Sequence, residues 1–244
     1  MIAEVMKKGF DVVLSSFPLL AVWFAFQLGL GVFPLLIYPA IVSYLATLHL
    51  ALALFVYASF YGPLVLFYVY LRAATLVYVR DNIKSGETRA SCFTYGFNYC
   101  FRLVLFYFVF LMIFIGIVLG IYLILTLFKI QESGIDFTIY LAAFIMVCMA
   151  TFMLYAPTII VADDAKTTPA MKRSVNVVRN HKKITLILFG FYALVWVLMG
   201  GFNMLTAEYS KWIILPLAAI LSSLFEIYIT AVVMNVYLRL SQNE

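Results

Sequence analysis

Glu226 is the residue whose type and position in this sequence most directly suggest chemistry. It lies in the middle of the apolar run 212–238 and is the only acidic residue inside any of the long apolar runs. Ser222, Ser223 and Thr230 are spaced so that a helix places all four polar side chains on one face. An ionised carboxylate at the centre of a bilayer costs at least ~2.5 kcal/mol, so this face should point into a helix bundle.

Two interpretations of this polar face stay open. The functional one is a binding site linked to a proton or a cation. The structural one is a protonated Glu226 that hydrogen-bonds to a neighbouring helix, because a single carboxylate offers no relay partner.

A second group of candidate residues contains the acidic pair Asp163 and Asp164, with Asp81 and Asn82 at a similar place earlier in the chain. Such carboxylates could hold magnesium or handle phosphate at a membrane surface, but a third ligand is missing. Acidic residues before a helix also serve as turn and N-terminal charges, and we favour that role. Because no HExxH, catalytic triad, P-loop or GxGxxG motif occurs, we expect no catalytic residue, no metal and no cofactor.

A third group is basic and could contact lipid headgroups: Lys172, Arg173, Arg179, Lys182 and Lys183. These cations could bind lipid phosphates specifically, or they could only fix the orientation of the chain in the membrane. The second role is sufficient to explain them.

The amino-acid composition indicates that membrane-spanning helices must position these residues. Of the 244 residues, 66% are hydrophobic and 11% are charged. A soluble domain carries about 25% charged residues, so this chain could not cover its own surface in water. We predict a single integral membrane domain, 1–244, of the all-α class.

The apolar runs predict six transmembrane helices. Each is about as long as the ~20 residues that cross the hydrocarbon core of a bilayer. Their approximate bounds are 12–32, 46–71, 103–128, 138–161, 184–204 and 212–238.

The distribution of cations predicts the orientation of these spans. Short cytoplasmic loops collect Lys and Arg. With six spans, Lys129 and Lys211 fall on one side and the other 14 on the opposite side, namely Lys7, Lys8, Arg72, Arg80, Lys84, Arg89, Arg102, Lys166, Lys172, Arg173, Arg179, Lys182, Lys183 and Arg239. We therefore expect a multi-pass protein of the plasma membrane with both termini cytoplasmic.

The sequence contains a weak internal repeat. Residues 79–98 align without gaps to 161–180, and residues 6–13 align to 171–178. The offsets are near one third and two thirds of the chain, which predicts a pseudo-threefold arrangement of units near 1–78, 79–160 and 161–244.

Each unit is predicted to begin with a cytoplasmic amphipathic elbow helix followed by two spans. In the third unit, Thr168 is the expected N-cap and Pro169 the first helical residue. The apolar faces comprise Ile2, Val5, Met6, Gly9, Phe10 and Val13 in the first unit, Ala90, Phe93, Phe97, Cys100 and Phe101 in the second, and Met171, Val175 and Val178 in the third.

A family resemblance rests on Pro157, Asp163, Asp164 and the segment PAMKRSVNVVRNHKKI at 169–184. Together they resemble the membrane domain of some glycerophosphoryl diester phosphodiesterases and of related stand-alone prokaryotic membrane proteins. The resemblance covers essentially the whole chain and implies a bundle of six or so spans with elbow helices. In the enzymes of that group a separate soluble barrel carries catalysis, and we expect no such domain here. No functional residue is carried over.

We therefore expect a non-enzymatic membrane component that binds, moves or senses a lipid-like or apolar molecule around Glu226 and the basic elbows. The alternative is an anchor or scaffold for a protein partner. An enzyme acting on lipid headgroups through Asp81, Asp163 and Asp164 ranks last. Membrane lipids are the expected partners, and a protein partner or homo-oligomer is left open. No nucleic acid is expected, because membrane orientation explains the net charge of +5.

Overall fold

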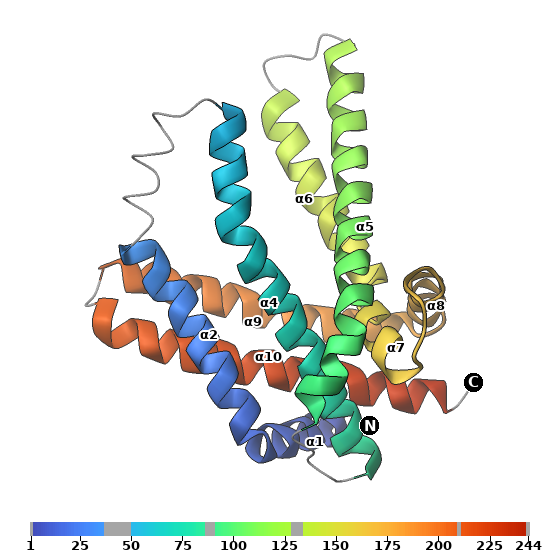
Figure 1. Ribbon diagram of the computed structural model, residues 1–244. Coiled ribbons are helices and arrows are strands. Elements are labelled where there is room, and N and C mark those ends of the chain that lie inside the picture. Colours follow the sequence, from blue (N-terminus) through green and yellow to red (C-terminus); the bar gives the residue numbers. More distant parts are fainter. Residues whose placement is uncertain (1, 37–49, 86–90, 128–133, 209–210, 243–244) are drawn as a thin grey trace. The chain divides into compact units, whose positions relative to one another are not determined.

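The computed structural model describes residues 2–36, 50–85, 91–127, 134–208 and 211–242, and these are almost entirely helical with no strand. The predicted all-α class is confirmed for this part of the chain (Figure 1). The helices are α1 (Ile2–Ser15), α2 (Phe17–Leu36), α4 (Leu50–Ser85), α5 (Cys92–Leu127), α6 (Gly134–Phe152), α7 (Ala156–Ala162), α8 (Thr167–Asn180), α9 (Lys182–Glu208) and α10 (Lys211–Ser241).

The described helices agree with the predicted multi-pass membrane protein. By length and composition, four segments could cross a membrane, or five if the bent pair α1 and α2 counts as one span. In the segment Cys92–Ile124 only 6% of the most apolar window is buried inside the protein. An apolar surface of that extent needs a lipid environment. The four segments are Tyr61–Ser85, Cys92–Ile124, Tyr140–Ala162 and Leu215–Ser241.

The count of six spans is not confirmed by the described residues. Helix α9 covers the fifth predicted span, 184–204, but is not among the four or five candidates. The loop expected between the first two spans and the cation Lys129 lie outside the described residues. The second predicted span also ends later than expected, because α4 continues past residue 71 to Ser85.

The chain divides into two compact units, which we describe separately. The first unit comprises Met1–Asn98 and Gly190–Glu244, and the second comprises Tyr99–Phe189. In the first unit α10 packs against α1, α2 and α4. In the second unit α8 packs against α6 and α7.

Helix α1 meets α2 at an 81° bend (Figure 1). Pro18, the second residue of α2, has no N–H to donate to the preceding turn, so the first helix cannot continue unbroken. At the end of α1, Ser16 Oγ donates to the Val13 carbonyl over 2.8 Å, and the Tyr78 hydroxyl donates to the Ser15 carbonyl over 2.7 Å. These bonds satisfy carbonyls that a helix terminus leaves without partners.

The amphipathic helix predicted at the N-terminus is present as α1, and it packs on α10. Gly9 allows the close approach, because a Cβ there would lie 2.9 Å from Val232 Cγ2 and 3.2 Å from Tyr228 Cε2. Val5 and Val13 are buried as the apolar face requires. Phe10 belongs to the same predicted face but is 58% exposed, because the apolar stripe is wider than the contact with α10.

The second predicted elbow is not a separate helix. Residues 92–101 form the first turns of α5, which runs to Leu127 without a described break. No Pro or Gly follows Gly96 until Gly116, so nothing local ends the helix. The buried side is also different, since Gly96 lies against the Ala74 backbone while Phe97 and Phe101 are exposed.

A helix, α8, is present where the third elbow is predicted, but it starts at a different residue. Lys166 occupies the N-cap position, so Thr168 is not the N-cap and Pro169 is the third helical residue. Proline is tolerated there because the first amides of a helix have no intrahelical acceptor. Thr167, at the first helical position, donates its hydroxyl to the Arg102 carbonyl over 3.1 Å, which ties the start of α8 to α5.

The buried face of α8 is rotated from the predicted one. Ala170, Ser174, Val177 and Val178 are buried, whereas Met171 and Val175, predicted on the apolar face, are only partly so. The reason lies in Ser174, whose side chain is drawn inward by two polar backbone groups.

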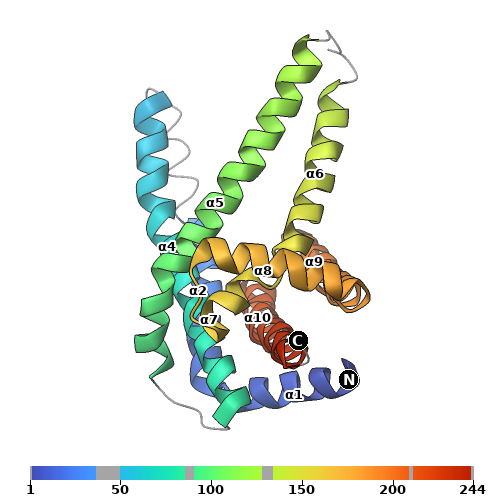
Figure 2. The same cartoon turned by 90° about the vertical axis from the view of Figure 1, so that its right-hand side faces the viewer.

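Ser174 supports the break between α6 and α7, which lie beside α8 (Figure 2). Its hydroxyl accepts a hydrogen bond from the Tyr155 amide over 3.3 Å and donates one to the Phe152 carbonyl over 2.8 Å. Pro157 at the start of α7 cannot donate to the preceding turn, which interrupts the helix here. A polar residue on α8 thereby satisfies groups that the interruption leaves open.

Candidate functional site

Glu226 on α10 forms an ion pair with Arg72 on α4. The Tyr68 hydroxyl, one turn before Arg72, also donates to Glu226 Oε1 over 3.2 Å. Both helices belong to the first unit and are in contact. The carboxylate therefore has two partners on one neighbouring helix. We name Arg72 and Glu226 the α4–α10 ion pair, with Tyr68 as its additional hydrogen-bond donor.

The other polar residues predicted beside Glu226 do not bond to its carboxylate in the hydrogen bonds that the structure describes. Ser223 donates to the Ala219 carbonyl over 2.6 Å, and Thr230 donates to the Glu226 carbonyl over 2.7 Å. Both are buried, and their hydroxyls are satisfied within α10 itself. Ser222 is partly exposed on the same helix. Of the four polar residues predicted to share this face, Glu226 is the one whose side chain bonds to a neighbouring helix in the contacts that the structure describes.

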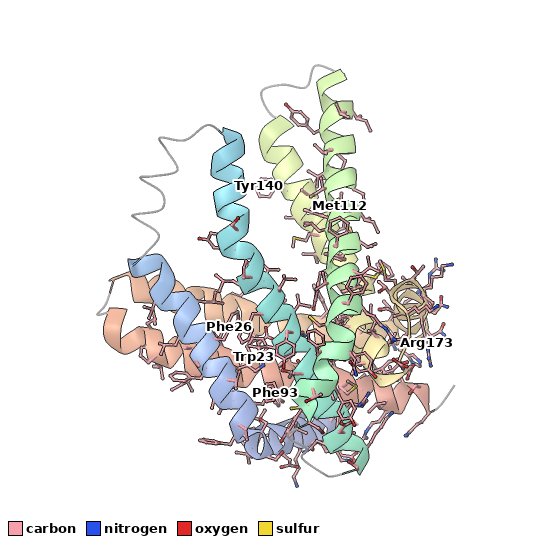
Figure 3. All side chains as sticks on the ribbon, in the orientation of Figure 1. Trp23, Phe26, Phe93, Met112, Tyr140 and Arg173 are labelled. Atoms are coloured by element: carbon pink, nitrogen blue, oxygen red, sulfur yellow. The ribbon has the colours of Figure 1, made fainter. Side chains whose placement is uncertain are left out.

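An aromatic cluster from α2 and α4 packs against Tyr68 of this site. Trp23 is fully buried and donates its indole N–H to Thr75 Oγ1 over 2.8 Å. Its ring meets the Tyr68 ring edge-on with centroids 5.6 Å apart, and Phe26 lies 6.0 Å from Trp23 and 5.2 Å from Phe67. Figure 3 shows Trp23 and Phe26 on the α2 side of this contact. The cluster makes an apolar wall beside a charged pair.

The electrostatics of the pair follow from its depth and exposure. Arg72 and Glu226 lie roughly 20 Å from the C-terminal ends of their helices, given a rise of 1.5 Å per residue. Their side chains are 17% and 22% exposed. In a low-dielectric surrounding each charge requires the other, and the pair together is neutral. Such a site can receive a charged or strongly polar group only by sharing or displacing one of the two partners.

The sequence reasoning missed Arg72 and Tyr68 as members of this site. Arg72 was assigned to a cytoplasmic loop because it follows the apolar run 46–71. A signal was available, since a carboxylate within a span needs a partner and Arg72 is the first cation after Lys8. The partner is 154 residues away in the sequence, however, and only the contact between α4 and α10 identifies it.

Asp163 and Asp164 lie in the loop between α7 and α8, where each pairs with an arginine. Asp163 forms an ion pair with Arg173, and Asp164 Oδ1 lies 2.6 Å from Arg102 Nη1. Arg102 also donates to the Asp164 carbonyl over 3.0 Å. Asp164 has a positive φ of 53°, a conformation that Asp adopts more readily than most residues. These contacts close the loop onto α5 and α8.

Asp81 and Asn82 occupy a different setting, within the last turns of α4. Asp81 Oδ1 accepts from Arg80 Nε over 2.8 Å, and Asn82 Nδ2 donates to Ser15 Oγ over 3.3 Å. Across the residues that the structure describes, no group of three His, Cys, Asp or Glu side chains is placed to hold a metal ion.

The basic candidates are exposed at their places in the second unit. Lys172, Arg173 and Arg179 lie on the outer face of α8, and Lys182 and Lys183 begin α9. Figure 3 shows Arg173 on the outside of α8. Of these, Arg173 is held by Asp163, so its guanidinium also has a structural role.

Comparison with known proteins identifies no relative: no family model, no curated protein and no solved structure matches this chain.

Proposed function

We propose that this chain is a non-enzymatic integral membrane protein that binds, moves or senses a lipid-like or apolar molecule through the region of the α4–α10 ion pair. The observation that carries the proposal is Glu226 held by Arg72 and Tyr68 within two candidate spans. A buried ion pair is weak evidence for stability, because apolar residues of similar volume often serve as well. Charges retained inside a span are more often found where a pathway or ligand requires them.

The surroundings of the pair support a ligand with an apolar body and a polar end. Phe67 offers exposed aromatic surface beside the buried rings of Phe26 and Trp23, and the pair offers both a cation and an anion. Ligand sites commonly combine mainly apolar walls with a few placed polar groups. The residual exposure of both charged side chains leaves them reachable.

The proposal includes six crossings in three repeat units, the second of which lacks a separate elbow helix, with both termini on the cytoplasmic side of the plasma membrane. Support comes from the first unit, where Glu4 of α1 forms an ion pair with Arg239 near the end of α10. This contact between the first and last described helices favours an even number of crossings. The four candidate segments, counted together with α2 and α9, would give the six crossings of the proposal.

Native mass spectrometry of the protein, extracted gently from its own membrane, tests the ligand proposal. The comparison is wild type with Glu226→Gln, and Asp11→Asn is the matched control because it neutralises an exposed carboxylate in the same unit. We expect a lipid or small molecule on the wild type and on the control, and its loss from Glu226→Gln.

Two outcomes would contradict the proposal. One is a ligand that stays bound to Glu226→Gln at the wild-type level. The other is a stoichiometric protein partner with no bound small molecule, which would make the chain a scaffold.

A further inference from the structure

A cavity of about 590 Å³ lies in the first unit, where α1 meets the C-terminal ends of α4 and α10. Lys8 reaches it from α1, Lys84 from α4 and Arg239 from α10. Ile83 and Leu238 add apolar surface. This cavity is separate from the α4–α10 ion pair, because its lining residues lie about 14 to 20 Å from that pair along the two helices.

Asn235 is the most informative residue of the cavity wall. It is 3% exposed, and its Oδ1 accepts a hydrogen bond from Arg239 Nε over 3.3 Å. Its Nδ2 donor has no hydrogen-bond partner among the described residues. A buried donor left open costs about 1 to 3 kcal/mol, so an acceptor at this place would be stabilising.

The charge of the lining specifies which acceptor fits. None of the described lining residues is acidic, and three of them are cations. Arg239 Nη1 and Nη2 donate to the two carboxylate oxygens of Glu4 over 3.0 and 2.7 Å, so Glu4 offsets the charge of Arg239. Lys8 and Lys84 bring two further cationic side chains to the lining.

Helix dipoles alone do not account for this arrangement. Lys84 and Arg239 lie in the last turns of α4 and α10, where cations compensate the partial negative charge of a helix end. Lys8 lies on α1 instead, in the middle of that helix, and the open amide of Asn235 is a donor that a helix dipole does not require.

We infer that this cavity binds a phosphate group. Phosphate offers several acceptor oxygens and negative charge, which match an amide donor placed among ammonium and guanidinium groups. The same chemistry comes from a lipid headgroup with an exposed phosphate or from free phosphate. The inference does not rest on the proposed function, because it concerns different residues.

The test is native mass spectrometry of the full chain in detergent, titrated with inorganic phosphate and, separately, with dioctanoyl phosphatidic acid. Two variants remove hydrogen-bond donors of the cavity. One is Asn235→Leu, which is similar in size, and the other combines Lys8→Gln and Lys84→Gln in one chain. The matched control is Lys7→Gln, an exposed lysine next to Lys8 that does not line the cavity.

We expect binding to the wild type and to Lys7→Gln, and at least a tenfold weaker affinity in both donor variants, since hydrogen bonds to charged groups contribute about that much or more. Binding of both probes would show that free phosphate suffices, and binding of phosphatidic acid alone would identify a lipid headgroup. If Asn235→Leu does not fold, the lysine variant decides, because both lysines are exposed.

Two results would overturn the inference. The first is no binding of either probe to the wild type. The second is that Lys7→Gln lowers the affinity for the probes as much as the Lys8→Gln, Lys84→Gln double variant does. That result would indicate only attraction to a basic surface.

Discussion

The guanidinium of Arg72 and the carboxylate of Glu226 join α4 to α10 across 154 residues of sequence. Removing one partner leaves the other charge without compensation. We expect Arg72→Met to lower the free energy of unfolding by up to ~3 kcal/mol, the lower end for buried pairs because this pair keeps some exposure. Arg72→Met combined with Glu226→Met should recover most of that loss. Thermal unfolding in detergent measures both, and a double variant less stable than the single one would contradict the explanation.

The hydrogen bond from Trp23 to Thr75 predicts a coupling between α2 and α4. Trp23→Phe should cost about 1 kcal/mol or more, because the Thr75 hydroxyl loses its donor in a fully buried place. Thr75→Val is the matched change on the other side. A double-mutant cycle of thermal unfolding should give a coupling energy above zero, and simple additivity would show that the bond does not matter.

Two glycines of α5 should respond in opposite ways to the same substitution. A Cβ at Gly96 would lie 2.8 Å from the Ala74 backbone, whereas nothing lies within 4 Å of a Cβ at Gly116. Gly96→Ala should destabilise by about 1 to 3 kcal/mol through overpacking. Gly116→Ala should be neutral or stabilising by up to ~1 kcal/mol, because Ala is the better helix former. Loss of stability at Gly116 would instead reveal a partner against that face.

Ser174 should be needed for the interrupted helix between α6 and α7. Ser174→Ala removes an acceptor for the Tyr155 amide and a donor for the Phe152 carbonyl, so we expect a loss of roughly 1 to 3 kcal/mol. Thr151→Val is the control, because the Thr151 hydroxyl bonds only to the Val147 carbonyl of its own helix. Equal thermal stability of the two variants would argue against the role of Ser174.

The residues that the sequence identified well are those whose local pattern decides their structure. The helical spacing of apolar residues in 2–13 and 169–178 predicts amphipathic helices, and the structure has α1 and α8 at these places. The α1 helix is separated from α2 because Pro18 interrupts the chain at that point. Between Gly96 and Gly116 no such residue occurs, and the expected elbow there merges into α5.

The parts that sequence reasoning could not supply depend on distant contacts. Glu226 was recognised because a carboxylate in an apolar run is costly. Its partner Arg72 was not recognised, because a cation at the end of an apolar run is usually a loop residue. In the structure α4 continues past Arg72 to Ser85, which places Arg72 inside the helix. The face of α8 was misjudged by one position, because Ser174 is drawn inward by bonds to two other segments.

The central claim is that the α4–α10 ion pair serves a bound ligand rather than the fold. Its most direct test is native mass spectrometry of the Arg72→Met, Glu226→Met double variant beside the wild type, once thermal unfolding has shown that the variant is folded. We expect a folded protein that has lost the lipid or small molecule carried by the wild type. A folded double variant that retains the same ligand at the same occupancy would contradict it.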